Sequence, residues 1–146
     1  MEEPPAEMQF ALGQLYCTNH DVPPLAADSA RSYDWKGHRY EWLHEKSRGS
    51  RICLDVEGLD TPAPDAIVPH GMNTRDFWAA WTFAEACCKI SDVPILQWIR
   101  TLPLVVPRSG VVLQMPVQFP SSSSAWSFTD CWPEQNVVFT CAWLQI

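Results

Sequence analysis

The chain has 146 residues, a formal net charge of −7, 47% apolar and only 18% charged residues, and eight tryptophans. This composition excludes an intrinsically disordered chain and fits one compact, aromatic-rich domain, whose usual size is about 100–200 residues. The acidic balance argues against nucleic-acid binding, because neutralising phosphates requires a concentrated basic face.

The N-terminus and the cysteines indicate the compartment. The start, "MEEPPAEMQF", is acidic and contains prolines, unlike the basic and then apolar start of a secretion signal. No segment approaches the ~20 continuous apolar residues of a membrane span. Of six cysteines, Cys87 and Cys88 are adjacent in a predicted helix, which is a poor arrangement for a secreted disulfide framework. We therefore expect an intracellular protein, cytoplasmic or nuclear, with free thiols and no membrane span.

The first part of the chain predicts short strands around an aromatic stretch. "MQFALGQLY" (8–16) and "RICLDVE" (51–57) are strand candidates. Between them lies "YDWKGHRYEWLHEK", Tyr33 to Lys46. A two-residue turn at Lys36-Gly37, with Gly37 supplying a positive φ, predicts a β-hairpin. A short helix over "HRYEWLHEKS" is the alternative, and it would scatter the aromatic side chains.

The predicted hairpin has one aromatic face. With a two-residue turn, Trp35 faces His38 and Tyr33 faces Tyr40, and directly opposed residues share a face. The other face carries paired charges. The aromatic face is either buried against the helices or exposed to receive a partner protein. In the second case its binding residues are Arg31, Tyr33, Trp35, Tyr40 and Trp42.

The middle of the chain predicts two helices after a proline-rich connector at 60–71. The first covers 73–89, with Asn73 or Thr74 as its N-terminal cap and an apolar stripe at helical spacing. The second covers 91–102 and tolerates Pro94 in its first turn. The predicted inward residues are Phe77, Trp81, Ala84 and Cys88 in the first helix and Ile95, Ile99 and Leu102 in the second.

The C-terminal part predicts strands. Residues 110–119 alternate between apolar and polar, and Pro116 places that strand at a sheet edge. A Ser-rich loop follows at 120–125. Residues 136–146 are apolar on both faces, as in a central strand. The sum is a single small α+β domain over 1–146, mostly antiparallel strands with a central helical hairpin.

One metal site and one catalytic pair can be assembled from these residues. Cys17, His20, His38 and His44 supply four ligands of the kinds that zinc prefers, although neither short-spaced pair has the usual spacing. "YEWLHEK" and "VPHGMN" are similar in part to the two histidine segments of T2-type ribonucleases, but a shorter spacing and a reversed order keep the chain outside that family. His44 and His70 are then the candidate acid–base pair.

No nucleophile elbow, phosphate-binding glycine loop or H-E-x-x-H motif is present. "RTLPLVVP" (100–107) also lacks SH3-ligand spacing, because Pro107 comes one residue late. We therefore expect a non-enzymatic adaptor or regulatory protein that binds another protein and has no cofactor. The alternatives are a zinc-stabilised regulatory module using Cys17/His20/His38/His44 and a small histidine-dependent hydrolase or nuclease.

Overall fold

The strands pair into two separate antiparallel sheets. The computed structural model describes residues 5–19, 21, 23–25, 29–44, 51–115 and 124–145. The N-terminal sheet has the order β1-β2-β4-β3, and the C-terminal sheet has the order β5-β8-β7-β6. Their bounds are β1 Ala6–Phe10, β2 Gly13–Asn19, β3 Ala30–Tyr33, β4 His38–Leu43, β5 Arg51–Gly58, β6 Val112–Gln114, β7 Ser124–Trp132 and β8 Val137–Gln145.

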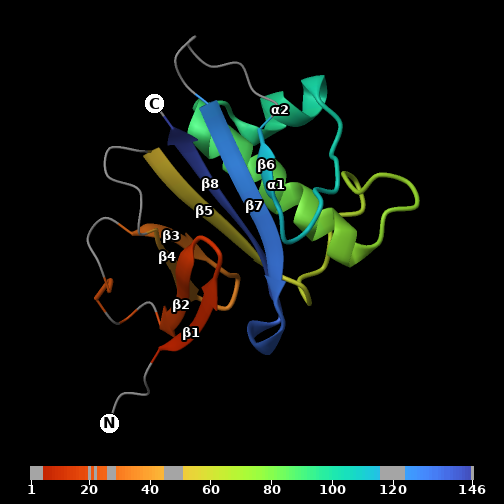
Figure 1. The fold of residues 1–146 in the computed structure, drawn as a ribbon. Helices are drawn as coiled ribbons and strands as arrows, with labels where there is room; N and C mark the ends of the chain where they lie inside the picture. The colour runs from red at the N-terminus through yellow and green to blue at the C-terminus, as the bar shows by residue number, and fades with distance from the viewer. Residues whose placement is uncertain are drawn as a thin grey trace.

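The C-terminal sheet is the middle of three layers (Figure 1). Helices α1 (Thr74–Ser91) and α2 (Ile95–Thr101) cover one of its faces, and the N-terminal sheet lies against the other. A short 3₁₀ helix, η1 (Pro133–Gln135), joins β7 to β8. The α+β prediction is confirmed, although the two helices form only a loose hairpin. Among the described residues, neither helix has the length and apolar character needed to cross a bilayer.

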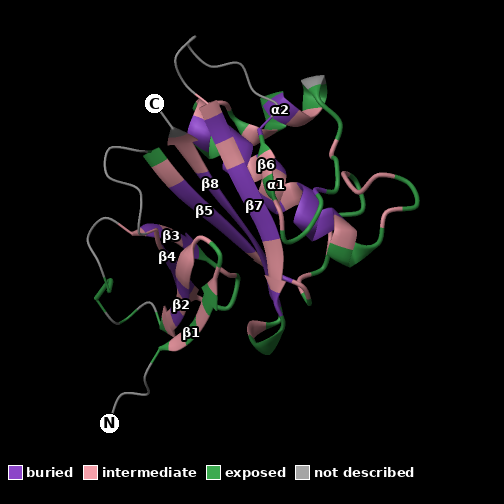
Figure 2. Cartoon of the chain, in the orientation of Figure 1, coloured by how far each residue is buried: buried purple, intermediate pink, exposed green. Residues whose placement is uncertain are grey.

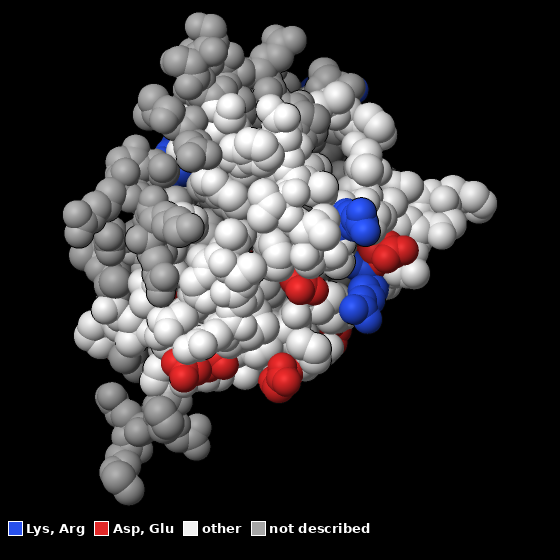
Figure 3. Space-filling view, viewed as in Figure 1, with Lys and Arg blue, Asp and Glu red and all other residues white. Residues whose placement is uncertain are grey.

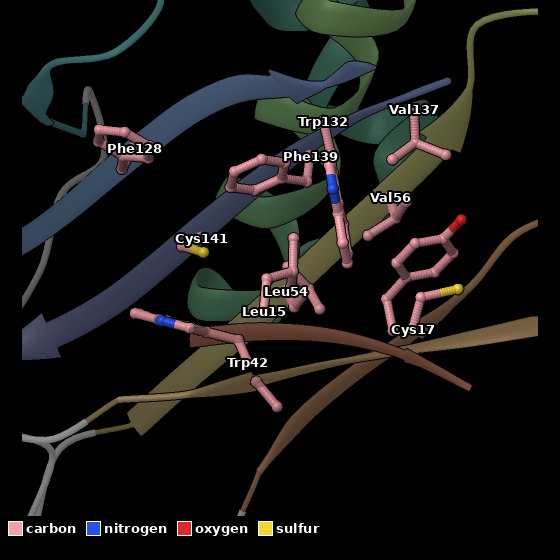
Figure 4. Close-up of a cluster of buried hydrophobic side chains, with 12 residues drawn as sticks. Leu15, Cys17, Trp42, Leu54, Val56, Phe128, Trp132, Val137, Phe139 and Cys141 are labelled. Atoms are coloured by element: carbon pink, nitrogen blue, oxygen red, sulfur yellow. The ribbon is translucent and has the colours of Figure 1, made fainter. Parts of the chain in front are cut away.

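The main core lies between the two sheets (Figure 4). Trp42 in β4 is 0% exposed, and its Nε1 donates to the Leu12 carbonyl at 3.1 Å. Such a side chain buries about 150–250 Å² and finds a partner for its N–H. The other buried members of this core are Leu15, Cys17, Ala30, Tyr40, Leu54, Val56, Phe128, Trp132, Val137, Phe139 and Cys141.

β8 is the central strand that the sequence predicts. It pairs with β5 on one side and β7 on the other. Because side chains alternate between faces, Phe139 and Cys141 enter the core between the sheets, whereas Ala142 packs toward α1. Figure 2 shows most of β8 as buried. The apolar run is thus explained by burial on both faces.

Of the two helices predicted from the sequence, the first agrees with the structure more closely than the second. α1 is confirmed, and Asn73 caps it by accepting from the Asp76 N–H at 2.8 Å. α2 is shorter than the predicted 91–102, because α1 continues to Ser91 and Pro94 lies at the N-cap of α2, before its first turn. Trp98 is its buried anchor at 8% exposed, whereas Leu102 is 38% exposed. The prediction that Leu102 faces inward is therefore wrong.

Three loop and edge predictions meet the structure in part. The connector packs onto α1 through Ala63, Ile67 and Val68. The strand predicted over 110–119 is observed only as β6, and its place at the sheet edge is confirmed. Residues 116–119 and 120–123 lie outside the described part of the chain. Ser124 and Ala125, predicted as loop, already belong to β7.

The register of the β3–β4 hairpin differs from the prediction by one residue. Ser32 pairs with Tyr40 and Tyr33 with Arg39, across a four-residue connection at 34–37. The Asp34 carboxylate causes this, because its Oδ1 accepts from the backbone N–H groups of Lys36 at 2.9 Å and His38 at 3.0 Å. A one-residue shift moves every side chain of β3 to the other face. The helical alternative is wrong over 38–43.

The burial of the hairpin tryptophans gives a first prediction. Trp42→Ala should lower the free energy of unfolding by about 3–5 kcal/mol, because it empties a site in the core. Trp35→Ala should cost about 1 kcal/mol or less, since Trp35 is 62% exposed at the turn. Urea unfolding of both variants against the parent measures this difference. Equal shifts of the two midpoints would contradict the observed register.

Candidate functional site

The five predicted binding residues do not share one surface. Tyr40 and Trp42 are 1% and 0% exposed in the core, so no partner can reach them. Arg31 and Tyr33 lie on the opposite face of the sheet, where Arg31 pairs across the strands with Glu41. Trp35 projects from the turn. Only Tyr33 and Trp35 remain exposed as aromatic side chains, and we call these two residues the hairpin tip.

The predicted zinc ligands are spread along the N-terminal sheet. His38 begins β4, and its Nδ1 lies 3.0 Å from Asp34 Oδ2. His44 follows the end of β4 and packs its ring 4.9 Å from that of Trp42. The two histidines are six positions apart along an extended strand, about 20 Å, whereas zinc ligands lie within about 2.3 Å of the ion. Cys17 is buried in the core and His20 lies outside the described residues. The structure does not bring these histidines to one ion.

The candidate acid–base pair is also divided. His44 lies against Trp42 and Trp143 at the end of the N-terminal sheet. His70 is exposed in the segment that precedes α1, and much of this segment extends on the helix side of the molecule (Figure 1). No contact joins the two histidines among the described residues. The geometry gives them no shared substrate position.

A groove lies where α1, α2, the segment 102–108 and β6 meet. Its cavity is about 550 Å³, within the roughly 300–1,000 Å³ typical of binding pockets. Arg108 and Gln114 are the polar side chains in a lining that is otherwise apolar. The lining residues are Ala80, Phe83, Ala84, Trp98, Leu102, Pro103, Leu104, Val105, Val106, Pro107, Arg108, Leu113 and Gln114.

Part of the apolar lining of the groove is open to solvent. Leu102, Val105 and Val106 line the groove yet are 38%, 58% and 40% exposed. Small-ligand sites enclose their ligand and orient it with several polar groups, which this open, apolar lining lacks. An exposed apolar patch of this kind is typical of a protein-binding surface.

Sequence reasoning missed this surface because the segment 102–108 has no regular periodicity. "LPLVVPR" fits neither helix nor alternating strand, and Pro103 and Pro107 exclude it from a strand ladder. A signal was nevertheless present. An apolar segment of this kind between a helix and an edge strand has to line a surface, because it cannot enter the sheet.

β6 presents an unpaired backbone edge next to the groove. Among the described residues it pairs only with β7. The Met115 N–H donates to the Ala125 carbonyl at 2.9 Å, so the backbone groups of Leu113 and Met115 point toward β7. Because these directions alternate, those of Val112 and Gln114 point away from the sheet. The groove therefore combines apolar side chains with backbone donors and acceptors that face no partner strand among the described residues.

The charge around the groove is sparse. Arg108 is the one charged side chain of its lining, although the chain as a whole has a net charge of −7. Figure 3 shows few charged atoms over β6 and β7, with acidic and basic side chains gathered along the lower and right-hand rim. The groove is thus locally apolar with a single positive charge.

A second cluster, of ionisable side chains, lies between α1 and the C-terminal sheet. Lys89 Nζ donates to Asp55 Oδ1 at 3.0 Å, and the other oxygen of Asp55 has no partner among the described residues. Burial raises the pKa of Asp55 to about 7, although Lys89 opposes the shift. Burial and the neighbouring Glu85 raise the pKa of Glu57 to about 7. Three carboxyl groups thus share one ammonium group.

This cluster offers no metal site. Within the part of the chain that the structure describes, no group of three or more His, Cys, Asp or Glu side chains is arranged to hold a metal ion. Its effect is on stability. A buried carboxyl that holds its proton more tightly when folded makes the folded state less stable as pH rises.

Comparison with known proteins adds no relative. No family model, no curated protein and no solved structure matches the chain.

The raised pKa values predict a pH dependence of stability. Between pH ~4, where an unfolded Asp or Glu titrates, and pH ~7, the folded state binds more protons than the unfolded state. The melting temperature should therefore fall from pH 5 to pH 8. Asp55→Asn should weaken this fall, because it removes one of the two groups while keeping an oxygen for Lys89.

Asp65→Asn, at an exposed position before α1, is the matched control and should keep the full dependence. Thermal melts of the parent and both variants at equal ionic strength make the comparison. If Asp55→Asn leaves the slope unchanged, the cluster does not have the proposed effect on stability.

Proposed function

We propose that this protein is a non-enzymatic adaptor or regulatory protein that works by binding another protein, and that the groove beside β6 is its binding surface. One observation carries the proposal. Of the eight large apolar side chains that are exposed in the described part of the chain, three line this groove side by side. They are Leu102, Val105 and Val106.

The arrangement of these residues supports binding of a macromolecule. Apolar residues exposed one at a time are normal on protein surfaces, but a contiguous patch is not. Trp98 and Phe83 form the floor of the groove from two helices, so the surface is shaped by rigid elements. Apolar, well-packed centres with aromatic residues dominate the energetics of protein interfaces.

The chemistry of the groove also favours binding over catalysis. Arg108 is the one ionisable side chain in the lining, and no hydroxyl, thiol, imidazole or carboxylate faces a substrate there. General acid–base or nucleophilic catalysis requires such groups within hydrogen-bond reach of the reacting atoms.

An intracellular location, cytoplasmic or nuclear, is part of the proposal. All six cysteines are free thiols, five of them buried. Burial raises the pKa of the Cys53 thiol to about 12, which makes it unreactive. A chain with six free cysteines is typical of a reducing compartment.

Paired surface variants test the proposal. Val105→Asp/Val106→Asp places two charges in the groove at exposed positions, so the fold should persist while partner capture falls at least tenfold. Tyr33→Asp/Trp35→Ala, on the hairpin tip, is the matched control and should capture partners as the parent does. Affinity capture with quantitative mass spectrometry, after circular dichroism has shown equal melting temperatures, measures both.

If the hairpin-tip variant loses partner capture and the groove variant keeps it, the binding surface is the hairpin tip and not the groove. Equal recovery of every partner by the parent and both variants would reject binding through either surface.

A further inference from the structure

We infer that the occupant of the groove is an extended segment of a partner protein, which adds as a strand to the outer edge of β6 and places apolar side chains in the groove and a carboxylate at Arg108. The inference rests on the proposed protein-binding function and specifies its partner. Addition of a strand at a sheet edge is an established way for a protein to recognise a peptide.

The backbone of β6 is the first part of the evidence. The N–H and C=O groups of Val112 and Gln114 point away from β7, and both residues are exposed. Together they offer two donors and two acceptors with the spacing of a β-ladder. Only a chain in extended conformation can satisfy all four groups at once.

The position of the groove is the second part. The segment 102–108 runs from α2 beside β6 before the chain turns at Ser109 and Gly110 (Figure 1). Leu113 and Gln114 from β6 line the cavity together with Val105 and Val106 from that segment. A strand added to β6 would therefore lie along an apolar wall. Every second side chain of such a strand would point into the groove.

The positive charge of the groove indicates the charge of the partner segment. Arg108 is the one charged group of the lining, and its guanidinium is exposed enough to pair with a carboxylate. A partner segment with Asp or Glu beside its apolar residues therefore complements the surface. A basic segment would meet repulsion there.

Other sheet edges do not offer the same combination. β1, at the edge of the N-terminal sheet, exposes the polar residues Glu7 and Gln9 where β6 has the apolar Val112. β5, at the far edge of the C-terminal sheet, lies against β3, and the Val56 N–H donates to Ser32 Oγ at 3.1 Å. That edge is therefore partly satisfied within the chain.

A pair of backbone variants tests strand addition. Gln114→Pro removes the outward N–H of residue 114 and leaves the hydrogen bonds between β6 and β7 in place. Gln114→Thr changes the side chain and keeps that N–H. The probe is an acetylated ten-residue peptide that alternates Val and Thr and ends in Glu-Asp. Fluorescence anisotropy should show binding to the parent and to Gln114→Thr, and at least tenfold weaker binding to Gln114→Pro.

The peptide provides an arm that does not depend on the folding of a variant. Two further peptides are made, each N-methylated at alternate amides, one along each edge of the extended peptide. The methyl groups remove the backbone donors of that edge and leave every side chain unchanged. One of the two methylated forms should bind at least tenfold more weakly than the unmodified peptide. Hydrogen exchange should also slow at the amides of Val112 and Gln114 when the peptide is bound.

The outcomes separate the inference from the proposed function. If both methylated peptides bind as tightly as the parent peptide, strand addition is wrong. If no peptide binds while Val105→Asp/Val106→Asp still abolishes partner capture, protein binding stands and the extended segment is rejected. If sedimentation shows a dimer that Gln114→Pro converts to a monomer, β6 pairs with a second copy, and the inference is overturned.

Discussion

The burial of β8 on both faces is the constraint on which the rest of the structure depends. A strand with water on neither side must be covered by two layers, and here they are the N-terminal sheet and α1. Central placement also requires a neighbour on each side, which β5 and β7 supply. The remaining strand, β6, can then occupy only an edge. The free edge beside the groove is thus a consequence of where β8 lies.

The two faces of the C-terminal sheet have different chemistry. The face toward the N-terminal sheet carries large rings, with Phe128 and Phe139 centred 6.3 Å apart. The face toward α1 carries small and polar groups, including the hydroxyls of Thr129 and Thr140, 2.8 Å apart, and Thr140 donates to Thr82 of α1 at 3.1 Å. Because these hydroxyls satisfy one another, the helix can bury them at little cost. Alanines at 79, 80, 84 and 86 let α1 approach closely.

The elements that the sequence predicts well are those with local causes. The cap at Asn73 and the apolar run over 136–146 act within a few residues of the structure they produce, so α1 and β8 are foreseen almost to their ends. Two failures come from single residues. Asp34 captures two backbone N–H groups and lengthens the β3–β4 turn. Gly13, at φ 122°, helps to split the strand predicted over 8–16 into β1 and β2.

The groove was missed in the sequence because it depends on strand pairing that two prolines prevent. Pro103 and Pro107 have no N–H, and each fixes φ near −65°, so the segment between α2 and β6 cannot pair fully with its neighbour. It therefore contributes side chains to a wall, and the outward groups of β6 face no partner strand in the part of the chain that the structure describes. A sequence with ordinary residues at these positions could have closed the sheet with its own chain. The prolines keep an apolar wall and an open strand edge side by side, which is the pair of features that an extended partner segment requires.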